Sequence, residues 1–324
     1  GRVAAWGIQY DARKDLNDWT EQAWYLPSYN DSDWKAAKQM RQPARAPFYG
    51  LYPSEIPPLN NYGLANCENY PEESFPFVSD GKTIKCVVDF NKNLTPYFDI
   101  EADAGLTVNV DSNFKRNTIK TSYTTKAGRQ QFESLSWMNA RTIKYTIPKG
   151  VTVHGLKYRW TGVGSTPGHF EADDEWYSRI WQMAENTLYI CARDNFMDTP
   201  DRERGLWIGD VADQTGAVFY TLDEPGRLLL KKGIDNTIAY QTSDVIQGLA
   251  PGFGDYRGKS SELTSQSQQY IAQGIWRYYY NTGDKSTLAN AYPSVQAYLK
   301  LWNMKPNGLP EARKGYASWI DWGP

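Results

Sequence analysis

Apolar and polar residues alternate through the first half of the chain, in short stretches that Gly, Asn, Asp and Pro separate. A period of two residues is typical of strands with one buried face, and several such strands predict a β-sandwich or jelly roll. The pattern is clearest in residues 83–90, 97–102, 106–112, 141–147 and 156–163. Three prolines in residues 51–61 exclude an interior strand, so we place a domain boundary near residue 58. Residues 1–58 are then expected to be the end of an N-terminal β-sandwich unit, and residues 59–170 a β-sandwich or jelly-roll domain.

The apolar period changes to that of a helix after residue 170. Residues 173–194 open with carboxylates, which suit a helix N-terminus, and their apolar residues recur on one helical face. That face carries Trp176, Ile180, Trp181, Ala184, Leu188 and Cys191. The same period predicts further helices at residues 209–222, 225–241, 262–281 and 285–303, with long loops at 194–208 and 242–261. Five helices without intervening strands predict stacked antiparallel helix pairs in residues 171–324.

The composition of the 324 residues excludes several classes of partner. Lys and Arg number 35 against 37 Asp and Glu, a net charge of −2, so no basic stripe is available for a nucleic acid. The longest apolar runs are far shorter than the ~20 residues that cross a bilayer, so we expect no membrane span. Three widely spaced cysteines and two histidines predict neither a disulfide framework nor a metal site, and we expect no cofactor.

Aromatic residues are unusually frequent for a polar chain. Trp, Tyr and Phe make up 15% of the residues, at a mean hydropathy of −0.65. Rings with a polar handle suit surfaces that are apolar on one side and wet on the other, and sugars offer such surfaces. The plainer interpretation is that these rings fill hydrophobic cores.

The densest polar cluster lies in residues 194–213, in a predicted loop between two helices. Six carboxylates gather there, namely Asp194, Asp198, Asp201, Glu203, Asp210 and Asp213. Arg193, Arg202, Arg204 and Trp207 lie among them. One interpretation is a solvated loop with ion pairs. The other is a site for a polyhydroxylated ligand, because glycoside hydrolysis needs a protonated carboxylic acid, a second carboxylate and binders for hydroxyls.

The segment DTPDRERGLWIGD, residues 198–210, resembles the signature of the α-L-rhamnosidases of glycoside hydrolase family 78, D-C-P-x-R-D-E-R-x-G-W-x-G-D. Other segments similar to the family follow in family order, at residues 51–59, 123–145, 274–284 and 319–323. The resemblance implies β-sandwich domains followed by an (α/α)6 toroid, and inverting hydrolysis of terminal non-reducing α-L-rhamnosides. It also implies rhamnose-containing glycans or glycosides as partners, and a periplasmic or secreted protein.

The resemblance implies a role for each charged or aromatic residue of the signature. The Glu of the signature is the general acid, and it corresponds to Glu203. The residues that line the sugar site correspond to Asp198, Trp207 and Asp210. Arg202 and Arg204 match the two arginines and are expected to orient the carboxylates.

The segment departs from the signature at two positions. One residue is missing between the first Arg and the Glu, so Glu203 is assigned by the following Arg204 and by its spacing from Trp207. A gap placed elsewhere would make Asp201 the rival acid. Thr199 replaces a Cys, which costs little because neither side chain need take part in the chemistry.

Three residues outside the signature are further candidates for substrate binding. Glu262 resembles a family position near the sugar, and together with Gln266 and Asp321 it would complete the near side of the pocket. The alternative for Glu262 is a plain charge at a helix N-terminus, and for Asp321 an ordinary loop carboxylate.

The general base of the family has no counterpart in this sequence. It is a Glu from the second half of the toroid, and five predicted helices fall short of six helix pairs. The irregular, aromatic residues 315–324 also indicate that the chain stops inside a domain. We therefore expect the first half of a toroid, a base supplied by the missing second half, and little activity from these residues alone. Two alternatives stay open: a non-catalytic carbohydrate-binding protein, and a related inverting glycosidase that acts on another sugar.

Overall fold

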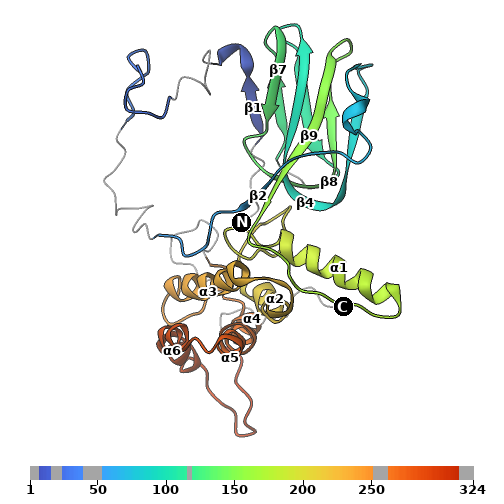
Figure 1. Cartoon of the computed structure of the whole chain (residues 1–324). Coiled ribbons are helices and arrows are strands. Elements are labelled where there is room, and N and C mark those ends of the chain that lie inside the picture. The colour runs from blue at the N-terminus through green and yellow to red at the C-terminus, as the bar shows by residue number, and fades with distance from the viewer. Residues whose placement is uncertain (1–6, 16–23, 39–52, 115–118, 251–261, 314–324) are drawn as a thin grey trace.

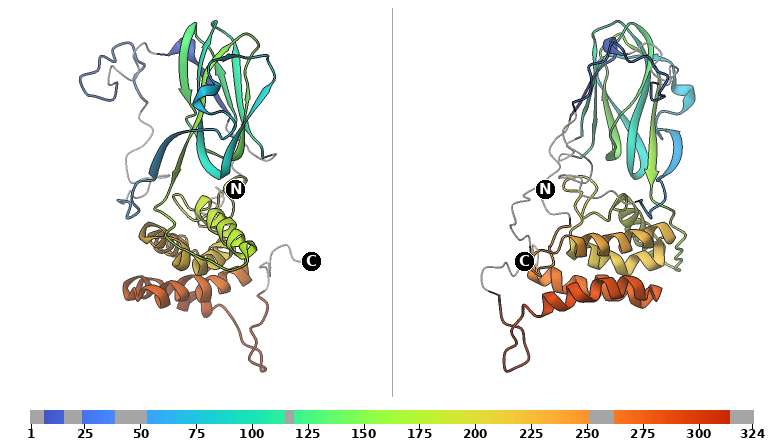
Figure 2. Two further views of the ribbon diagram at one scale, coloured as in Figure 1. Left: turned by 45° about the vertical axis from the view of Figure 1, so that its right-hand side comes forward. Right: turned by 90° about the vertical axis from the view of Figure 1, so that its left-hand side faces the viewer.

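The structure is a computed structural model that describes residues 7–15, 24–38, 53–114, 119–250 and 262–313. The first half of the chain forms a curled sheet and the second half forms helices, as the change of hydrophobic period predicted (Figure 1). Figure 2 shows the sheet standing over the helices, which lie in stacked layers beneath it. The fold is therefore mixed, with the strands first and the helices after them.

Nine strands of the described residues form one hydrogen-bonded sheet, in the order β1-β6-β5-β8-β4-β9-β2, with β3 paired to β9 and β7 to β4. The strands are β1 (Ile8–Asp11), β2 (Asn60–Asn66), β3 (Phe77–Val78), β4 (Thr83–Ala102), β5 (Thr107–Ser112), β6 (Thr121–Thr124), β7 (Gly128–Glu133), β8 (Met138–Thr146) and β9 (Thr152–Gly162). β1 runs parallel to β6, so residues 8–11 extend the same sheet as the later strands. The domain boundary near residue 58 stays a prediction.

β4 is the longest strand and pairs with β7, β8 and β9. Its 20 residues cover two segments, 83–90 and 97–102, that the sequence pattern predicted as separate strands. The register between β4 and β8 shifts between Val87 and Lys92, which marks a bulge. A bulge interrupts the alternation of side chains without ending the strand, and for this reason the prediction of two strands was wrong.

Aromatic and branched side chains fill the core of the sheet. The Phe98 ring meets the Tyr123 ring edge-on at 5.1 Å between centroids, and Tyr10 stacks on Tyr123 at 5.6 Å. Met138, the first residue of β8, is completely buried in the same core. Burial of a side chain of this size contributes roughly 1.5 to 3 kcal/mol, which anchors the connection between β7 and β8.

The helices begin and end close to the predicted residues. They are α1 (Glu175–Ile190), α2 (Ile208–Thr221), α3 (Glu224–Ala239), α4 (Thr264–Gln269), the π-helical segment η3 (Tyr270–Trp276), α5 (Arg277–Thr282) and α6 (Lys285–Leu299). The single helix predicted at 262–281 is the continuous path through α4, η3 and α5. Asp174 caps α1, because its side chain accepts a hydrogen bond from the Trp176 amide at 2.9 Å, as the leading carboxylates predicted. Within the described part of the chain, no helix combines the length and apolar character that a bilayer span requires.

The predicted apolar face of α1 is covered only near the end of the helix. Leu188 is 6% exposed, whereas Trp176 and Ile180 are 60% and 42% exposed. The covered end meets the sheet: the Asn93 side chain of β4 donates to the Ile190 carbonyl at 2.6 Å. The sheet therefore holds the C-terminal end of α1, from which the carboxylate-rich loop departs.

Candidate active site

The carboxylate-rich loop connects α1 to α2 and is closed on itself by two hydrogen bonds. The Asp198 amide donates to the Gly205 carbonyl at 3.0 Å, and the Gly205 amide donates to Asp198 Oδ1 at 2.9 Å. A tight turn over residues 200–203 lies between them. The closure presents Glu203 from a short, constrained loop.

The carboxylate of Glu203 is held by two donors from the same loop. Trp207 Nε1 donates to Glu203 Oε2 at 2.9 Å, and Arg202 Nη2 lies 3.0 Å from Glu203 Oε1. The Glu203 side chain keeps 18% of its surface exposed, so a ligand can reach it. Charge-assisted hydrogen bonds to both oxygens fix the orientation of the carboxylate.

Asp198 is a carboxylate of this cluster whose pKa is clearly raised. The pKa of Asp198 is raised to about 6, mainly by burial; hydrogen bonds from the Gly205 and Thr199 amides oppose this shift, and the negative charges of Glu203 and Asp210 contribute to it. Asp210 lies in the first turn of α2, where the helix dipole favours a negative charge. Glu203 and Asp210 therefore lie close enough to Asp198 to act on it electrostatically.

The two arginines of the signature point to different partners. Arg202 contacts Glu203, whereas Arg204 Nε donates to the Pro200 carbonyl of the same loop at 3.0 Å and the Arg204 guanidinium packs on the ring of Trp137. Burial raises the pKa of Asp201, and the Arg204 charge opposes this shift. Arg204 therefore acts on Asp201 and the loop backbone.

Glu262 is buried in a separate polar cluster near the end of the described helices. The residue as a whole is 4% exposed, and its Oε1 accepts hydrogen bonds from Tyr298 at 2.8 Å and from Arg313 Nη1 at 2.6 Å. Burial raises the pKa of Glu262, and Tyr298 and Arg313 counter that shift. Glu262 lies two residues before α4, just outside the helix, whose N-cap is Leu263.

Gln266 of α4 lies against the first turn of α2. A Cβ atom added to Gly209 would approach Gln266 Cδ to 2.6 Å, so only a glycine permits this contact. The Gln266 Oε1 atom is buried and has no hydrogen-bond partner among the described residues. α4 thus places Gln266 at the start of α2. The Oε1 atom of Glu262 is bound instead by Tyr298 and Arg313. Asp321 lies outside the described residues.

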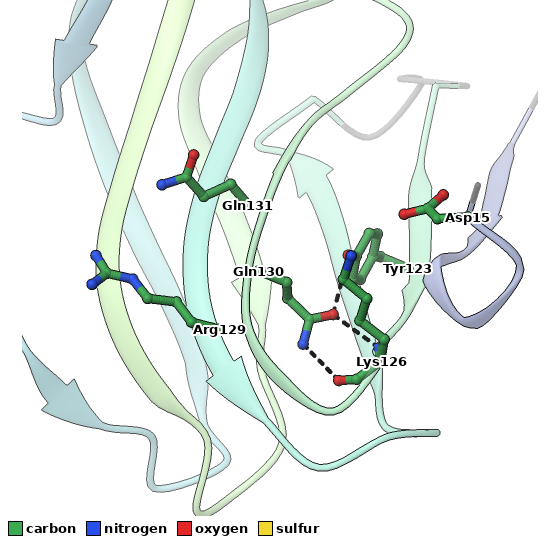
Figure 3. A pocket seen from close by; sticks show the side chains of 6 residues that line it. All are labelled: Asp15, Tyr123, Lys126, Arg129, Gln130 and Gln131. Carbon is green, nitrogen blue, oxygen red and sulfur yellow. Dashed lines mark hydrogen bonds between the residues drawn. The ribbon is translucent and has the colours of Figure 1, made fainter. Parts of the chain in front are cut away.

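Two of the hollows formed by the described residues bear on the location of a site. One, with a volume of about 520 Å³, is a mostly apolar groove between α1 and α2 that reaches Asp198. The other, of about 390 Å³, lies on the sheet between β6 and β7 (Figure 3). There the Gln130 side chain is already saturated, since it accepts from Tyr123 and from the Lys126 amide and donates to the Lys126 and Gly128 carbonyls. Of these two hollows, the groove beside Asp198 is the one that reaches the loop.

Sequence reasoning missed one residue that contacts this loop. Trp137, in the connection between β7 and β8, packs against Arg204 and Arg193. A lone Trp next to a strand carries no periodic signal, and its partners lie more than fifty residues away in the chain. In the described ranges, no three His, Cys, Asp or Glu side chains are arranged to hold a metal ion.

Comparisons with known proteins agree with this architecture. Residues 165–324 match the family model described as the bacterial alpha-L-rhamnosidase 6 hairpin glycosidase domain. An α-L-rhamnosidase of Streptomyces avermitilis is 24% identical over 343 residues, which cover 97% of this chain and 30% of that protein. The α-L-rhamnosidase from Dictyoglumus thermophilum has a similar fold, with a TM-score of 0.70 at 18% identity, over 90% of this chain and 33% of that one.

A GH78 family rhamnosidase of Bacillus sp. GL1 is also similar in fold, with a TM-score of 0.62 at 18% identity, over 69% of this chain and 25% of that one. A sheet followed by helices, together with these likenesses, places the chain in the class of the glycosidase domains that it matches. The chain belongs to glycoside hydrolase family 78, the family of the α-L-rhamnosidases. It spans between a quarter and a third of the length of these three relatives.

Proposed function

We propose that this protein hydrolyses terminal non-reducing α-L-rhamnosides with inversion of configuration, and that Glu203 is the general acid. The observation that carries the proposal is the Glu203 carboxylate, held by Trp207 and Arg202 on a loop that matches the family signature. A general acid must point one fixed oxygen at the leaving group, and two donors on the carboxylate provide that fixation. Glu203 protonates the glycosidic oxygen as the bond to the sugar breaks.

The remaining residues of the loop are proposed to bind the sugar. The Trp207 ring offers an apolar face to the C–H face of the sugar. Asp210 accepts from sugar hydroxyls as an ionised carboxylate, and Arg202 donates to them on the side away from Glu203. Asp198, with a pKa of about 6, donates or accepts according to pH. Glu262 and Asp321 are retained as proposed binders, with Glu262 oriented through Arg313 and Tyr298.

The general base is proposed to come from outside this chain. An inverting enzyme needs its two carboxyl groups roughly 6.5 to 9.5 Å apart, with a water between the base and the sugar. We assign the described helices to the first half of an (α/α)6 toroid over residues 171–324, after β-sandwich domains over residues 1–58 and 59–170. Further helix pairs of the same toroid would cover the exposed apolar residues of α1 and carry the base. The apolar face of α1 supports this assignment.

The test compares Glu203→Gln with the unchanged complete enzyme on two α-L-rhamnosides. An alkyl rhamnoside has a poor leaving group that needs protonation, whereas a nitrophenyl rhamnoside has a good one that does not. We expect kcat/KM to fall about 10²- to 10⁴-fold on the alkyl substrate and far less on the nitrophenyl substrate. Gln keeps an acceptor for Trp207, so the loop stays in place.

Asp201→Asn is the matched control, since Asp201 is the rival acid two residues away. An equal loss on both substrates for Glu203→Gln, or a leaving-group dependence that follows Asp201, would refute the assignment of the acid. Saturable binding of rhamnosides without any turnover by the complete protein would instead identify a carbohydrate-binding protein. Turnover of another aryl glycoside in a screen would identify a different sugar.

A further inference from the structure

Trp137 brings the sheet into contact with the loop that bears Glu203. The guanidinium carbon of Arg204 lies 3.4 Å from the centroid of the Trp137 ring, a full stacking contact. Arg204 Nη2 also approaches the Trp137 carbonyl oxygen at 3.5 Å. The residue after Trp137 is the fully buried Met138, so the indole is mounted on the rigid start of β8.

A second arginine holds the same indole from the end of α1. The guanidinium carbon of Arg193 lies 4.4 Å from the centroid of the Trp137 ring. Arg193 is 8% exposed, and its two terminal nitrogens donate to the carbonyl and the hydroxyl of Thr161 in β9, each at 3.1 Å. The Trp137 ring therefore contacts two arginines: Arg193, which is hydrogen-bonded to the sheet, and Arg204, which comes from the loop.

Arg204 needs this support because its backbone is in a costly conformation. Its φ angle is +54°, in the left-handed region that a side chain with a Cβ disfavours. The pKa of Arg204 is lowered to about 10, mainly by burial; the negative charge of Asp201 opposes this shift, and the positive charge of Arg193 contributes to it. The face of the Trp137 ring and the Asp201 carboxylate compensate the buried charge. Loss of the ring would remove the main reason for Arg204 to keep this conformation.

The conformation of Arg204 decides where Glu203 points. Because the backbone reverses at Arg204, the Arg204 side chain faces the sheet while the preceding Glu203 faces Trp207 and Arg202. Gly205, which follows directly, closes the loop on Asp198. We propose that Trp137 is a positioning residue for the general acid, acting through Arg204; this inference rests on the proposed function of Glu203.

The test measures kcat and KM of Trp137→Ala and Trp137→Phe in the complete enzyme, on the alkyl and nitrophenyl rhamnosides. For Trp137→Ala we expect kcat on the alkyl substrate to fall about 10²-fold, because a displacement near 1 Å has an effect of that order. KM and the turnover of the nitrophenyl substrate should change little, since neither depends on the orientation of the Glu203 oxygen that donates the proton. Trp137→Phe should restore most of the loss, since it keeps an aromatic face.

Trp160→Ala is the matched control, because Lys92 lies 4.5 Å over the centroid of the Trp160 ring in a similar cation–ring contact that involves neither Arg204 nor Arg193. It should lower stability without changing the ratio of rates on the two substrates. The inference is overturned if Trp137→Ala lowers kcat equally on both substrates, raises KM alone, or leaves kcat on the alkyl substrate unchanged.

A second measurement separates this inference from the proposed function. In the 324-residue chain, unfolding of Trp137→Ala, Arg204→Gln and the double variant gives the coupling between the two side chains. We expect the coupling to change the unfolding constant about fivefold or more. An absent coupling overturns the inference whatever the activity, whereas a clear coupling in an enzyme inactive on every rhamnoside overturns only the proposed function.

Discussion

The buried ion pair between Arg313 and Glu262 provides a direct test of how the helical part is stabilised. Arg313 Nη1 lies 2.6 Å from Glu262 Oε1, and the two side chains are 11% and 0% exposed. Arg313→Met keeps the apolar stem but removes the positive charge. The Glu262 carboxylate would then be buried with one fewer donor, and removing one partner of such a pair costs about 3 to 5 kcal/mol.

We expect a loss near the lower limit, about 3 kcal/mol, because Tyr298 still donates to Glu262 at 2.8 Å. That loss reduces the folded-to-unfolded ratio by roughly 10²-fold, out of a total stability of about 5 to 15 kcal/mol. The assay is urea unfolding of the 324-residue chain at neutral pH, followed by far-ultraviolet circular dichroism. Lys82→Met is the control, because the Lys82–Asp80 pair is exposed and should contribute under about 1 kcal/mol.

The pH dependence of this loss has a definite sign. Burial raises the pKa of Glu262 in the folded protein, and removal of Arg313, which counters the shift, raises it further. In the folded variant the Glu262 carboxyl group therefore stays protonated over a wider pH range than it does in the unfolded chain. The free energy of unfolding of the variant then decreases as the pH rises above the unfolded pKa, and it decreases more than that of the wild-type protein. The loss should therefore be small in acid and largest at neutral pH. A loss below about 1 kcal/mol at neutral pH, or no recovery in the Glu262→Gln, Arg313→Met double variant, would refute the reasoning.

Two further predictions concern the loop and the first turn of α2. The pKa of Asp198 rises from 3.8 to about 6 on folding, so the wild-type protein loses stability as the pH rises between these values. Asp198→Asn should remove this dependence, and thermal unfolding of both proteins from pH 4 to 7 checks it; parallel curves would contradict the shift. Gly209→Ala should destabilise by about 1 to 3 kcal/mol, because its Cβ would meet Gln266 Cδ at 2.6 Å. Gln266→Ala should relieve most of that loss in urea unfolding, and failure to do so would place the strain elsewhere.

Local patterns along the chain were enough to predict most elements and the loop. The helical period placed α2 and α3 to within one or two residues, because an amphipathic helix repeats its own signal at every turn. The leading Asp174 predicted the cap of α1, since a cap is a contact between residues two or three apart. The loop that carries Glu203 could also be found from residue types and spacing alone.

Contacts between distant segments were decided by the tertiary structure. The register shift within β4 depends on its pairing with β8, a later strand of the chain. β1 pairs in parallel with β6, which lies more than a hundred residues further along the chain. The exposure of the α1 face depends on which elements cover a helix, which its own period does not encode. The stacking of Arg204 on Trp137 results from the packing of the loop against the sheet. The local sequence pattern does not predict such a contact, because it depends on where the two distant segments lie in space.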